Sequence, residues 1–449
     1  MATCHVVAMP YPGRGHVNPM MNLCKKLASR SSHILVTFVV TEEWLGFIGS
    51  ETKPDNVRFS TIPNVLPSEL GRAADMVGFL EAVRTKMEEP FERLLDLLET
   101  PATVIVADAF FNWAVDVGHR RNIPVASFWA MPASVFSMFY HFDLVVQNGH
   151  FPVELSEKGE ELVDYIPGLS PIRLADIPTI FHMKDKRLSH KALHLMSNVP
   201  KSQYLLFSSI LELESPVVDA LQLIFQFPIY SLGPLIPYFN LEHSNSHATA
   251  CHDDPDYFKW LDSQPQNSVL YVSLGSFLSV SSTQMDEIVA GLLNSGVRCL
   301  WVARDKSSTL KEACGNAGMV VPWCDQLKVL CHSSVGGFLT HCGWNSTMES
   351  IFAGVPMLTL PLMLDQAPNC KFIVEDWKIG WKLKKWEIEN LVPREEIADL
   401  ARAFMDLENP KRKEMMKRSE KMKEICRGAI QKGGSSESNL DAFIKNISK

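Results

Sequence analysis

Hydrophobic residues recur with two different periods, in stretches that alternate along this chain. Short apolar runs rich in β-branched residues are typical of strands buried on both faces, and they are separated by stretches whose apolar residues recur with the period of an amphipathic helix. The predicted strands are residues 5–9, 34–40, 103–107, 125–129, 204–208, 229–232, 268–274, 300–303, 319–322, 335–340 and 355–360. This alternation predicts parallel sheets covered by helices, which is an α/β fold.

The alternation runs through the chain twice. Its first series ends at the turn-rich residues 233–237, and the polar residues that follow lack periodicity, which is typical of a linker. A chain of 449 residues is long enough to give two domains their own cores. We predict two doubly wound, Rossmann-like domains that face each other across a cleft. The predicted boundaries are an N-terminal domain 1–237, a linker 238–255, a C-terminal domain 256–433 and a last helix 434–449.

Local signals predict where several helices begin and end. Residues 76–98 carry one continuous apolar stripe and predict a single helix, whereas the Pro-rich residues 57–70 predict irregular structure. Gly354 is a natural helix stop. Three helix starts are marked by residues suited to capping the first turn, namely Asn18 before Pro19, Ser281 with Gln284, and Ser346 with Glu349.

The composition narrows the class of protein. With 46% hydrophobic and 21% charged residues it is that of a globular protein, and a net charge of −8 argues against a nucleic-acid partner. Ten cysteines without a regular framework predict free thiols in a reducing cytosol. No run approaches the ~20 apolar residues that span a bilayer, and the N-terminal apolar run is too short for a signal peptide. We expect a cytoplasmic monomer without a membrane span.

Side chains with catalytic potential follow two strands of the first domain. His16 lies beyond the loop after strand 5–9, and Asp108 directly follows strand 103–107. In α/β proteins the carboxyl ends of parallel strands are where ligands bind. From the residues alone, a structural histidine and a helix-capping aspartate remain open alternatives. Asp116 and His119 form a second possible pair.

Two other interpretations have less support. Gly13 and Gly15 follow a strand, as in a dinucleotide-binding fingerprint, but Asn18 stands where the third glycine is needed. Three histidines and one cysteine in the linker suggest a metal, but their spacing fits no standard site. We therefore predict no metal and no cofactor.

The second domain offers a site for an anion. Strand 335–340 leads through a short loop into a helix, and a helix N-terminus suits a phosphate group. Gly275 and Ser276 open a second such loop. An ordinary βαβ unit explains the capping spacing and Gly354. It does not explain why Trp323, His341 and Asp365 all lie at strand ends and loops.

The whole stretch from Trp323 to Gln366, with His-Cys-Gly-Trp-Asn-Ser at its centre, resembles the nucleotide-sugar box of plant family 1 glycosyltransferases. These enzymes use UDP-sugars to glycosylate small lipophilic molecules. Residues 15–20 (GHVNPM) match the motif that carries the general base of this family. The resemblance implies the two-domain glycosyltransferase B fold, in which the last helix crosses back to the first domain. The closing Gln366 implies UDP-glucose as the donor.

The resemblance also assigns roles. It implies that His16 is the general base and Asp108 its partner, that Trp323 stacks on uracil, and that Gln326 with Glu349 holds the ribose. The implied donor-binding residues are Ser276, Trp323, Cys324, Gln326, His341, Gly343, Trp344, Asn345, Ser346, Glu349, Asp365 and Gln366. Our candidates for an apolar acceptor pocket are Phe110, Phe111, Met131 and Phe181.

Two departures from the family pattern bear on these roles. The box opens Trp323-Cys324-Asp325-Gln326, whereas the family usually has Trp-Ala-Pro-Gln, and the missing proline leaves the turn less rigid. Gly15 stands where some relatives carry a residue with a hydroxyl group. That group, which could assist near the acceptor, is therefore missing, and His16 would act alone.

These observations predict an inverting UDP-glucose-dependent O-glucosyltransferase. Its acceptor would be a small lipophilic plant metabolite, such as a phenolic, a flavonoid, a terpenoid or a hormone, and N- or S-transfer stays open. The first alternative is a non-catalytic UDP-sugar-binding homologue. The second is a nicotinamide-dependent oxidoreductase, which also has two α/β halves.

Overall fold

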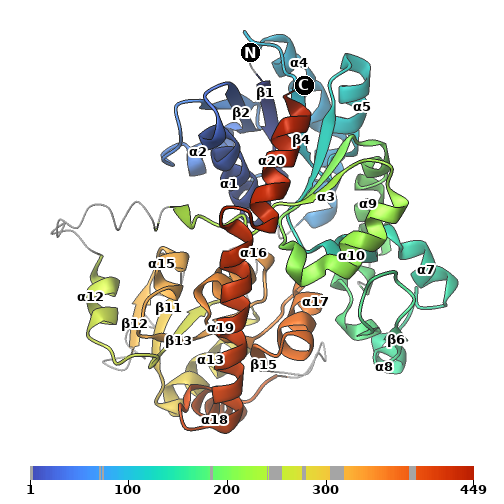
Figure 1. The fold of residues 1–449 in the computed structure, drawn as a ribbon. Helices are drawn as coiled ribbons and strands as arrows, with labels where there is room; N and C mark the ends of the chain where they lie inside the picture. Colours follow the sequence, from blue (N-terminus) through green and yellow to red (C-terminus); the bar gives the residue numbers. More distant parts are fainter. Residues whose placement is uncertain are drawn as a thin grey trace. The chain divides into compact units, whose positions relative to one another are not determined.

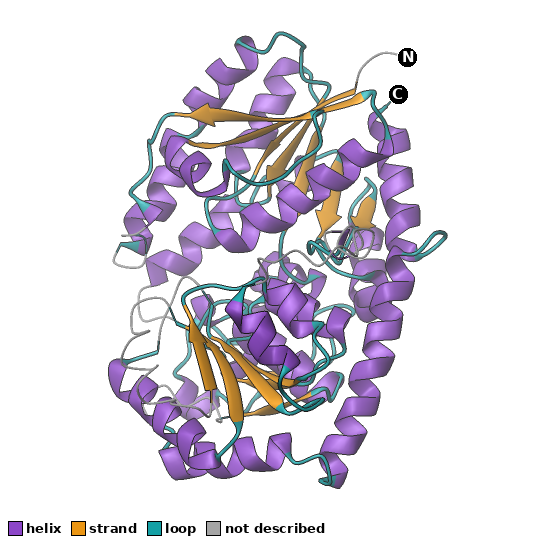
Figure 2. Cartoon of the chain, turned by 90° about the vertical axis from the view of Figure 1, so that its left-hand side faces the viewer, coloured by secondary structure: helices purple, strands orange, loops and turns teal. Residues whose placement is uncertain are grey.

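Two parallel β-sheets organise the chain in the computed structural model (Figure 1). The structure describes residues 4–69, 72, 75–182, 186–239, 241, 255–275, 280–303, 318–383 and 391–448. The chain divides into two compact units. Unit 1 comprises Met1–Leu174, Thr179–Ile236 and Gly428–Lys449, and unit 2 comprises Ala175–Pro178 and Pro237–Arg427. Helices cover both faces of each sheet (Figure 2), so each unit is doubly wound, as predicted.

The sheet of unit 1 has the strand order β3-β2-β1-β4-β5-β8-β9, and its described pairings are all parallel. The chain leaves β1 toward one edge and returns to β4 on the other side, so the order reverses between β1 and β4. Ligands bind at such a switch point. The strands are β1 (Cys4–Met9), β2 (Ile34–Thr41), β3 (Val57–Ile62), β4 (Val104–Asp108), β5 (Val125–Trp129), β8 (Tyr204–Phe207) and β9 (Ile229–Ser231), with a separate antiparallel pair β6 (Leu162–Val163) and β7 (Ile172–Arg173).

The sheet of unit 2 repeats this plan with the order β12-β11-β10-β13-β14-β15. Its order reverses between β10 and β13, so the loops after these two strands lie at a second switch point. The strands are β10 (Val269–Ser273), β11 (Arg298–Val302), β12 (Gly318–Val321), β13 (Val335–Thr340), β14 (Met357–Thr359) and β15 (Gly380–Lys382).

The helices of unit 1 are α1 (Arg14–Arg30), α2 (Glu42–Ile48), α3 (Met76–Lys86), α4 (Glu88–Asp96), α5 (Asn112–Arg121), α6 (Ala133–Tyr140), α7 (Phe142–Gln147), α8 (Leu155–Lys158), α9 (Lys186–Leu195), α10 (Leu211–Ile224) and α20 (Ser435–Ile447), with the short helices η3 (Thr179–Phe181) and η4 (Val199–Lys201). Those of unit 2 are α12 (Asp256–Asp262), α13 (Ser282–Ser295), α15 (Gln326–Leu330), α16 (Trp344–Ala353), α17 (Gln366–Lys371), the π-helical turn η6 (Phe372–Asp376) and α18 (Arg394–Met405). Two helices pass the division between units, η2 (Leu174–Asp176) and α19 (Pro410–Ile430).

The last helix belongs to the core of unit 1. Phe443 of α20 is fully buried in one hydrophobic cluster with Val6 and Ala8 of β1 and with α1. Polar contacts add to this packing, because the Asn439 side-chain amide donates to the Ser231 carbonyl over 3.0 Å. The cluster therefore joins the two ends of the chain, as the neighbouring positions of α20 and β1 in Figure 1 show.

The predicted start of the first helix is wrong. Helix α1 begins at Arg14 with Gly13 as its N-cap, and the Gly13 carbonyl accepts from the backbone N–H groups of His16 and Val17, both over 2.9 Å. Pro19 lies inside the helix, where its missing N–H removes one bond near the N-terminus. His16 consequently lies in the first helical turn and not in the loop before it.

Two further predictions in unit 1 are wrong. Residues 57–62 form β3 at the edge of the sheet, where polar residues and a following proline are tolerated. The single helix predicted for residues 76–98 is divided, since α3 ends at Lys86 and α4 begins at Glu88. Pro90 has no N–H to donate to the Lys86 carbonyl, which explains the break.

In unit 2 one predicted cap is confirmed and one is wrong. Ser281 caps α13 by accepting from the Gln284 N–H over 3.2 Å. Helix α16 begins at Trp344 with Gly343 as its N-cap, so Ser346 lies inside its first turn and caps nothing. Gly354 ends α16 in the left-handed conformation, with a φ of 78°, as predicted. The strand β15 was not among those predicted.

In the described part of the chain, no helix combines the length and the apolar character needed to cross a bilayer. Most of the predicted linker, 238–255, lies outside the described residues, and so do the histidines and the cysteine that suggested a metal there.

Candidate active site

The structure brings His16 and Asp108 together at the switch point of unit 1. Strands β1 and β4 are parallel neighbours with Met9 opposite Ala107, so both strands end at the same edge. His16 Nδ1 lies 2.7 Å from Asp108 Oδ2, and the other carboxylate oxygen accepts from the Phe110 N–H over 3.1 Å. An ionised carboxylate only accepts, so Nδ1 carries the proton. With the proton on Nδ1, Nε2 is the nitrogen whose lone pair can face a substrate.

The imidazole of His16 is held between aromatic rings. The ring centroid of Tyr11 lies 5.1 Å away and that of Phe110 lies 5.8 Å away. Asp108 is almost completely buried, whereas the His16 side chain keeps 17% of its surface exposed. A reactant can therefore reach His16 while its carboxylate partner stays shielded from water.

The four candidate acceptor residues differ in their surroundings. The Phe110 ring contacts His16, and its centroid lies 6.4 Å from that of Phe139. The Phe139 ring in turn lies 4.9 Å from the Phe181 ring, between centroids. Phe111 is buried and stacks on Trp113 with ring centroids 5.0 Å apart. Met131, two residues beyond β5, is half-buried. Phe110 is thus the candidate in direct contact with the dyad.

The second possible pair, Asp116 and His119, is engaged elsewhere. Both lie on α5, where Asp116 accepts from the Asn198 side-chain amide over 2.9 Å. The exposed His119 has its Nε2 3.2 Å from the Lys201 carbonyl oxygen. These contacts fasten α5 to the segment before β8, which is a structural role.

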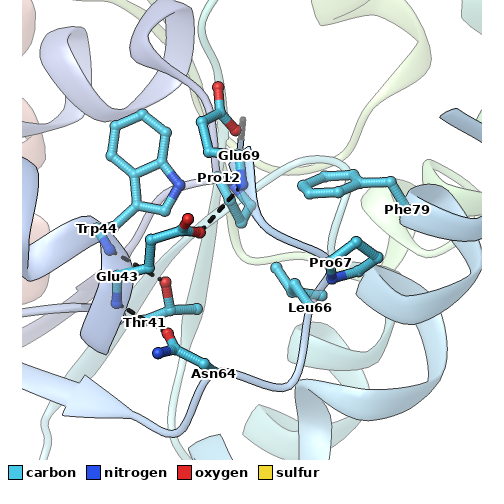
Figure 3. Close-up of a pocket in the computed structure, with 9 residues that line it drawn as sticks. All are labelled: Pro12, Thr41, Glu43, Trp44, Asn64, Leu66, Pro67, Glu69 and Phe79. Carbon is cyan, nitrogen blue, oxygen red and sulfur yellow. Dashed lines mark hydrogen bonds between the residues drawn. The ribbon is translucent and has the colours of Figure 1, made fainter. Parts of the chain in front are cut away.

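A small pocket lies beside the loop that precedes His16 (Figure 3). Glu43 spans one wall, accepting from the Ser68 hydroxyl over 2.6 Å and from the Glu69 N–H over 3.1 Å. Its lining residues are Pro12, Thr41, Glu43, Trp44, Asn64, Leu66, Pro67, Glu69 and Phe79. Sequence reasoning missed this pocket because it combines four segments, one of which was predicted to be irregular.

In unit 2, the N-terminus of α16 is prepared for an anion. Cys342 adopts a φ of 67°, which is unusual for a residue with a side chain, and it turns the chain from β13 into α16. The N-cap is Gly343, which has no side chain that could cap the first turn. Trp344 is buried, while Asn345 and Ser346 are half-buried in this turn. Such a helix end favours negative charge.

His341 occupies a narrow space between two glycines. A Cβ added to Gly275 would lie 2.7 Å from His341 Nε2, and one added to Gly343 would lie 2.5 Å from it. Burial lowers the pKa of His341 to about 4, so the ring is neutral at physiological pH. The neighbouring candidate Ser276 lies outside the described residues.

Asp365 and Gln366 are held at the start of α17. Asn369 donates its side-chain amide to Asp365 Oδ2 over 2.8 Å and to the Cys342 carbonyl over 2.9 Å. The side-chain oxygen of Gln366 accepts from the Leu362 and Met363 N–H groups, so its NH₂ end points the other way. Asn369 was missed from the sequence, although its spacing of four from Asp365 on a helix could have identified it.

The remaining candidates surround the first residue of α15. Trp323 is 66% exposed, whereas the next residue, Cys324, is buried. Gln326 donates its side-chain amide to Ser346 Oγ over 2.9 Å and to Glu349 Oε2 over 2.5 Å. Burial raises the pKa of Glu349 to about 7, although the Gln326 hydrogen bond opposes the shift. An exposed indole can stack on a planar base, and a fixed carboxylate can accept hydrogen bonds from a diol.

Comparison with known proteins points to one family. The family model described as UDP-glucoronosyl and UDP-glucosyl transferase matches residues 8–404. UDP-glycosyltransferase 87A1 of Arabidopsis thaliana is 53% identical over 98% of this chain and 100% of its own length. UDP-glycosyltransferase 87A2 of the same plant is 53% identical over 99% of this chain and 96% of its own length.

Solved structures give the same result. Medicago truncatula UGT71G1 complexed with UDP-glucose has a TM-score of 0.83 and 26% identity, covering 100% of this chain and 99% of that one. Os79 from O. sativa in complex with UDP has a TM-score of 0.84 and 25% identity, and the match covers 98% of this chain and 100% of that one. Together with the two doubly wound units, these likenesses identify the glycosyltransferase B fold. The chain therefore belongs to the UDP-glucoronosyl and UDP-glucosyl transferase family, and it is a UDP-glycosyltransferase of the plant type.

Proposed function

We propose that the protein transfers glucose from UDP-glucose, with inversion, to a hydroxyl group of a small lipophilic plant metabolite. The observation that carries this proposal is the contact of 2.7 Å between His16 and the buried Asp108. It supports a base that is correctly oriented and open on one side. Membership of the UDP-glycosyltransferase family identifies the class of reaction, and it excludes the oxidoreductase alternative.

In this mechanism His16 Nε2 removes the proton from the acceptor hydroxyl. Asp108 keeps the proton of the ring on Nδ1 and stabilises the imidazolium that forms, as a carboxylate does in other catalytic triads. The acceptor oxygen then attacks the anomeric carbon from the side opposite the leaving UDP. One displacement inverts the configuration, so an α-linked donor gives a β-glucoside.

The donor residues would stabilise the other reactant. We assign the uracil to the exposed Trp323 ring and the backbone of Cys324, and the ribose hydroxyls to Glu349. The diphosphate would accept hydrogen bonds from the α16 N-terminus and the neutral His341, which stabilise the charge that develops as UDP leaves. Trp344, Asp365 and Gln366 would contact the sugar. The NH₂ end of Gln366 suits a sugar hydroxyl, because its oxygen is already bound within the protein.

The acceptor class follows from the aromatic surroundings of His16. Rings of Tyr11 and Phe110 beside the base favour a flat or bulky apolar molecule over a charged one. Solved relatives agree with this range, since Phytolacca americana UGT2 was captured with pterostilbene and Os79 with a trichothecene. A phenolic, flavonoid, terpenoid or hormone bearing a hydroxyl group fits this description.

The test is UDP release from UDP-glucose with a panel of plant aglycones. We expect the wild-type chain to turn over at least one acceptor, and His16→Ala to lose about 100-fold or more of kcat while still binding UDP. His119→Ala is the matched control, because His119 is exposed and bonded to Lys201, and it should keep full activity. If the wild type binds UDP-glucose but transfers nothing, the non-catalytic alternative replaces this proposal.

A further inference from the structure

Four polar side chains of unit 2 form one continuous hydrogen-bonded chain, and one of them is Cys324, which directly follows the exposed Trp323 in the sequence. Tyr271 of β10 has its hydroxyl 3.4 Å from Cys324 Sγ and 3.1 Å from the side-chain oxygen of Gln326. The Gln326 nitrogen then reaches Glu349 Oε2 on α16. Tyr271 and Cys324 keep only 1% and 5% of their surface exposed, so water cannot take over their bonds.

The chemistry of the groups sets the direction of every bond in this chain. Above its pKa of about 7 Glu349 is ionised and can only accept, so the NH₂ end of Gln326 faces it and the oxygen end faces Tyr271. The single hydroxyl proton of Tyr271 is therefore committed to Gln326. This leaves the Cys324 thiol as the donor to the Tyr271 oxygen. Burial raises the pKa of Cys324 to about 11, which keeps the thiol protonated at neutral pH.

The packing around Tyr271 explains why its hydroxyl lies at this place. Its neighbours Leu270 and Val272 on β10 face the opposite side of the sheet, within the core under α13 and α18. Tyr271 therefore points toward α15 and α16, and its ring lies 5.0 Å from that of Phe338, its partner on β13. The ring is fixed by the sheet, so the hydroxyl is a rigid reference for Gln326.

Both amide hydrogens of Gln326 are used within the protein, one by Ser346 and one by Glu349. Gln326 can therefore act on a bound nucleotide chiefly by orienting the Glu349 carboxylate. We propose that Cys324 and Tyr271 are positioning residues for nucleotide binding, because together they fix the Gln326 amide and so present Glu349 to the ribose diol. This inference rests on the proposed function, and it gives a role to the cysteine that departs from the usual Trp-Ala-Pro-Gln opening.

The test combines two single variants and their double variant. Tyr271→Phe removes one hydrogen bond from Gln326 and should raise the KM for UDP-glucose and the Kd for UDP about five-fold, the usual size for one bond. Its kcat and its KM for the acceptor should not change. Cys324→Ala should raise the same two constants by less. The double variant should be no worse than Tyr271→Phe, since the thiol acts only through the tyrosine hydroxyl.

Two more variants separate positioning from packing. Cys324→Ser keeps a donor and should bind UDP more tightly than Cys324→Ala. Cys331→Ala is the matched control, because this exposed cysteine follows the same helix α15 and should leave all constants unchanged.

The proposal would be overturned if the increases in KM and Kd of the two single variants multiplied in the double variant. It would also be overturned if Cys324→Ser bound UDP no more tightly than Cys324→Ala. A loss of kcat with an unchanged KM for UDP-glucose would overturn it as well. If Tyr271→Phe does not fold, the comparison of Cys324→Ala with Cys324→Ser still decides. Failure of the wild-type chain to bind UDP would instead overturn the proposed function.

Discussion

His16 and Asp108 are 92 residues apart in the chain, yet their side chains meet at 2.7 Å because β1 and β4 end at the same edge of one sheet. This contact leads to a prediction for Asp108→Asn. The amide has no charge to stabilise an imidazolium and can turn its NH₂ toward Nδ1, which selects the wrong tautomer. We expect kcat to fall about 100-fold or more while UDP binding is unchanged, measured by steady-state kinetics and calorimetry.

The matched control for that variant is Asp116→Asn. Asp116 is also half-shielded on the neighbouring α5, but its partner is the Asn198 amide. Its replacement should keep most of the activity. Equal losses in the two variants would show that the effect is structural and that Asp108 has no special role.

A second prediction concerns the space around His341. Gly275→Ala places a Cβ 2.7 Å from His341 Nε2 at a φ of +86°, so it combines backbone strain with displacement of the imidazole. Gly296 also has a positive φ, +70°, but a Cβ there meets nothing within 4 Å. Both alanine variants should lose about 1 kcal/mol of unfolding free energy from the backbone alone. Only Gly275→Ala should also weaken UDP binding, by about ten-fold or more.

Thermal unfolding and UDP calorimetry on the two glycine variants check this prediction together. If Gly296→Ala weakens UDP binding as much as Gly275→Ala does, general loosening of unit 2 explains the effect. The role of His341 at the diphosphate would then lose its support.

A third prediction is the pH dependence of donor binding. Burial raises the pKa of Glu349 to about 7, so this side chain gains a proton as the pH falls below 7 and is a carboxylate above it. Ribose hydroxyls donate to the carboxylate, so UDP-glucose should bind more tightly at high pH. If only the ionised form binds, the Kd at pH 6 exceeds that at pH 8 by about ten-fold.

UDP-glucose suits this measurement better than UDP, because its diphosphate has no terminal phosphate that titrates near neutrality. Glu349→Gln should bind more weakly than the wild type and with a flat pH profile. A sloping profile that survives in Glu349→Gln would assign the titration to another group.

Much of the fold and of the candidate site follows from local pattern and strand order. Residues 125–129 and 335–340 were predicted as strands with their observed bounds, because continuous apolar runs leave little choice of register. The pairing of His16 with Asp108 was implied by the family resemblance and not by the residues alone. Strand order explains the contact, since His16 follows β1 and Asp108 ends β4, its neighbour in a parallel sheet. The break between α3 and α4 was missed because the apolar stripe continues across Pro90. The helical hydrogen bonds do not continue there, because Pro90 has no backbone N–H.

What could not be predicted depends on partners that are distant in sequence. Tyr271 looks like any strand residue until β10 is placed beside α15, which brings it to Gln326 across 55 positions. The pocket around Glu43 likewise requires the edge strand β3 and the loop after it. Neither spacing nor composition carries this information, because it arises only when the sheet orders its strands.

The last prediction tests the place of α20. Phe443 is fully buried, with its ring 5.6 Å from Tyr204 and 5.8 Å from Tyr230, so Phe443→Ala leaves a cavity in the core of unit 1. We expect a loss of about 3 to 5 kcal/mol in the unfolding free energy of that unit. Lys445→Ala, at an exposed position of the same helix, should change it little. Hydrogen exchange of the β1 and β9 amides identifies which unit is destabilised.

The affinity for UDP is an independent measurement on the same variant, because by our proposal UDP binds residues of unit 2. Phe443→Ala should therefore keep its affinity for UDP and the protection of unit 2 amides, while the amides of β1 and β9 exchange faster. Faster exchange in β10 and β13 instead would place the effect of α20 in the other unit. Unchanged exchange in both sheets would mean that α20 does not pack on β9 in solution, because a cavity next to Tyr230 cannot leave that strand unaffected.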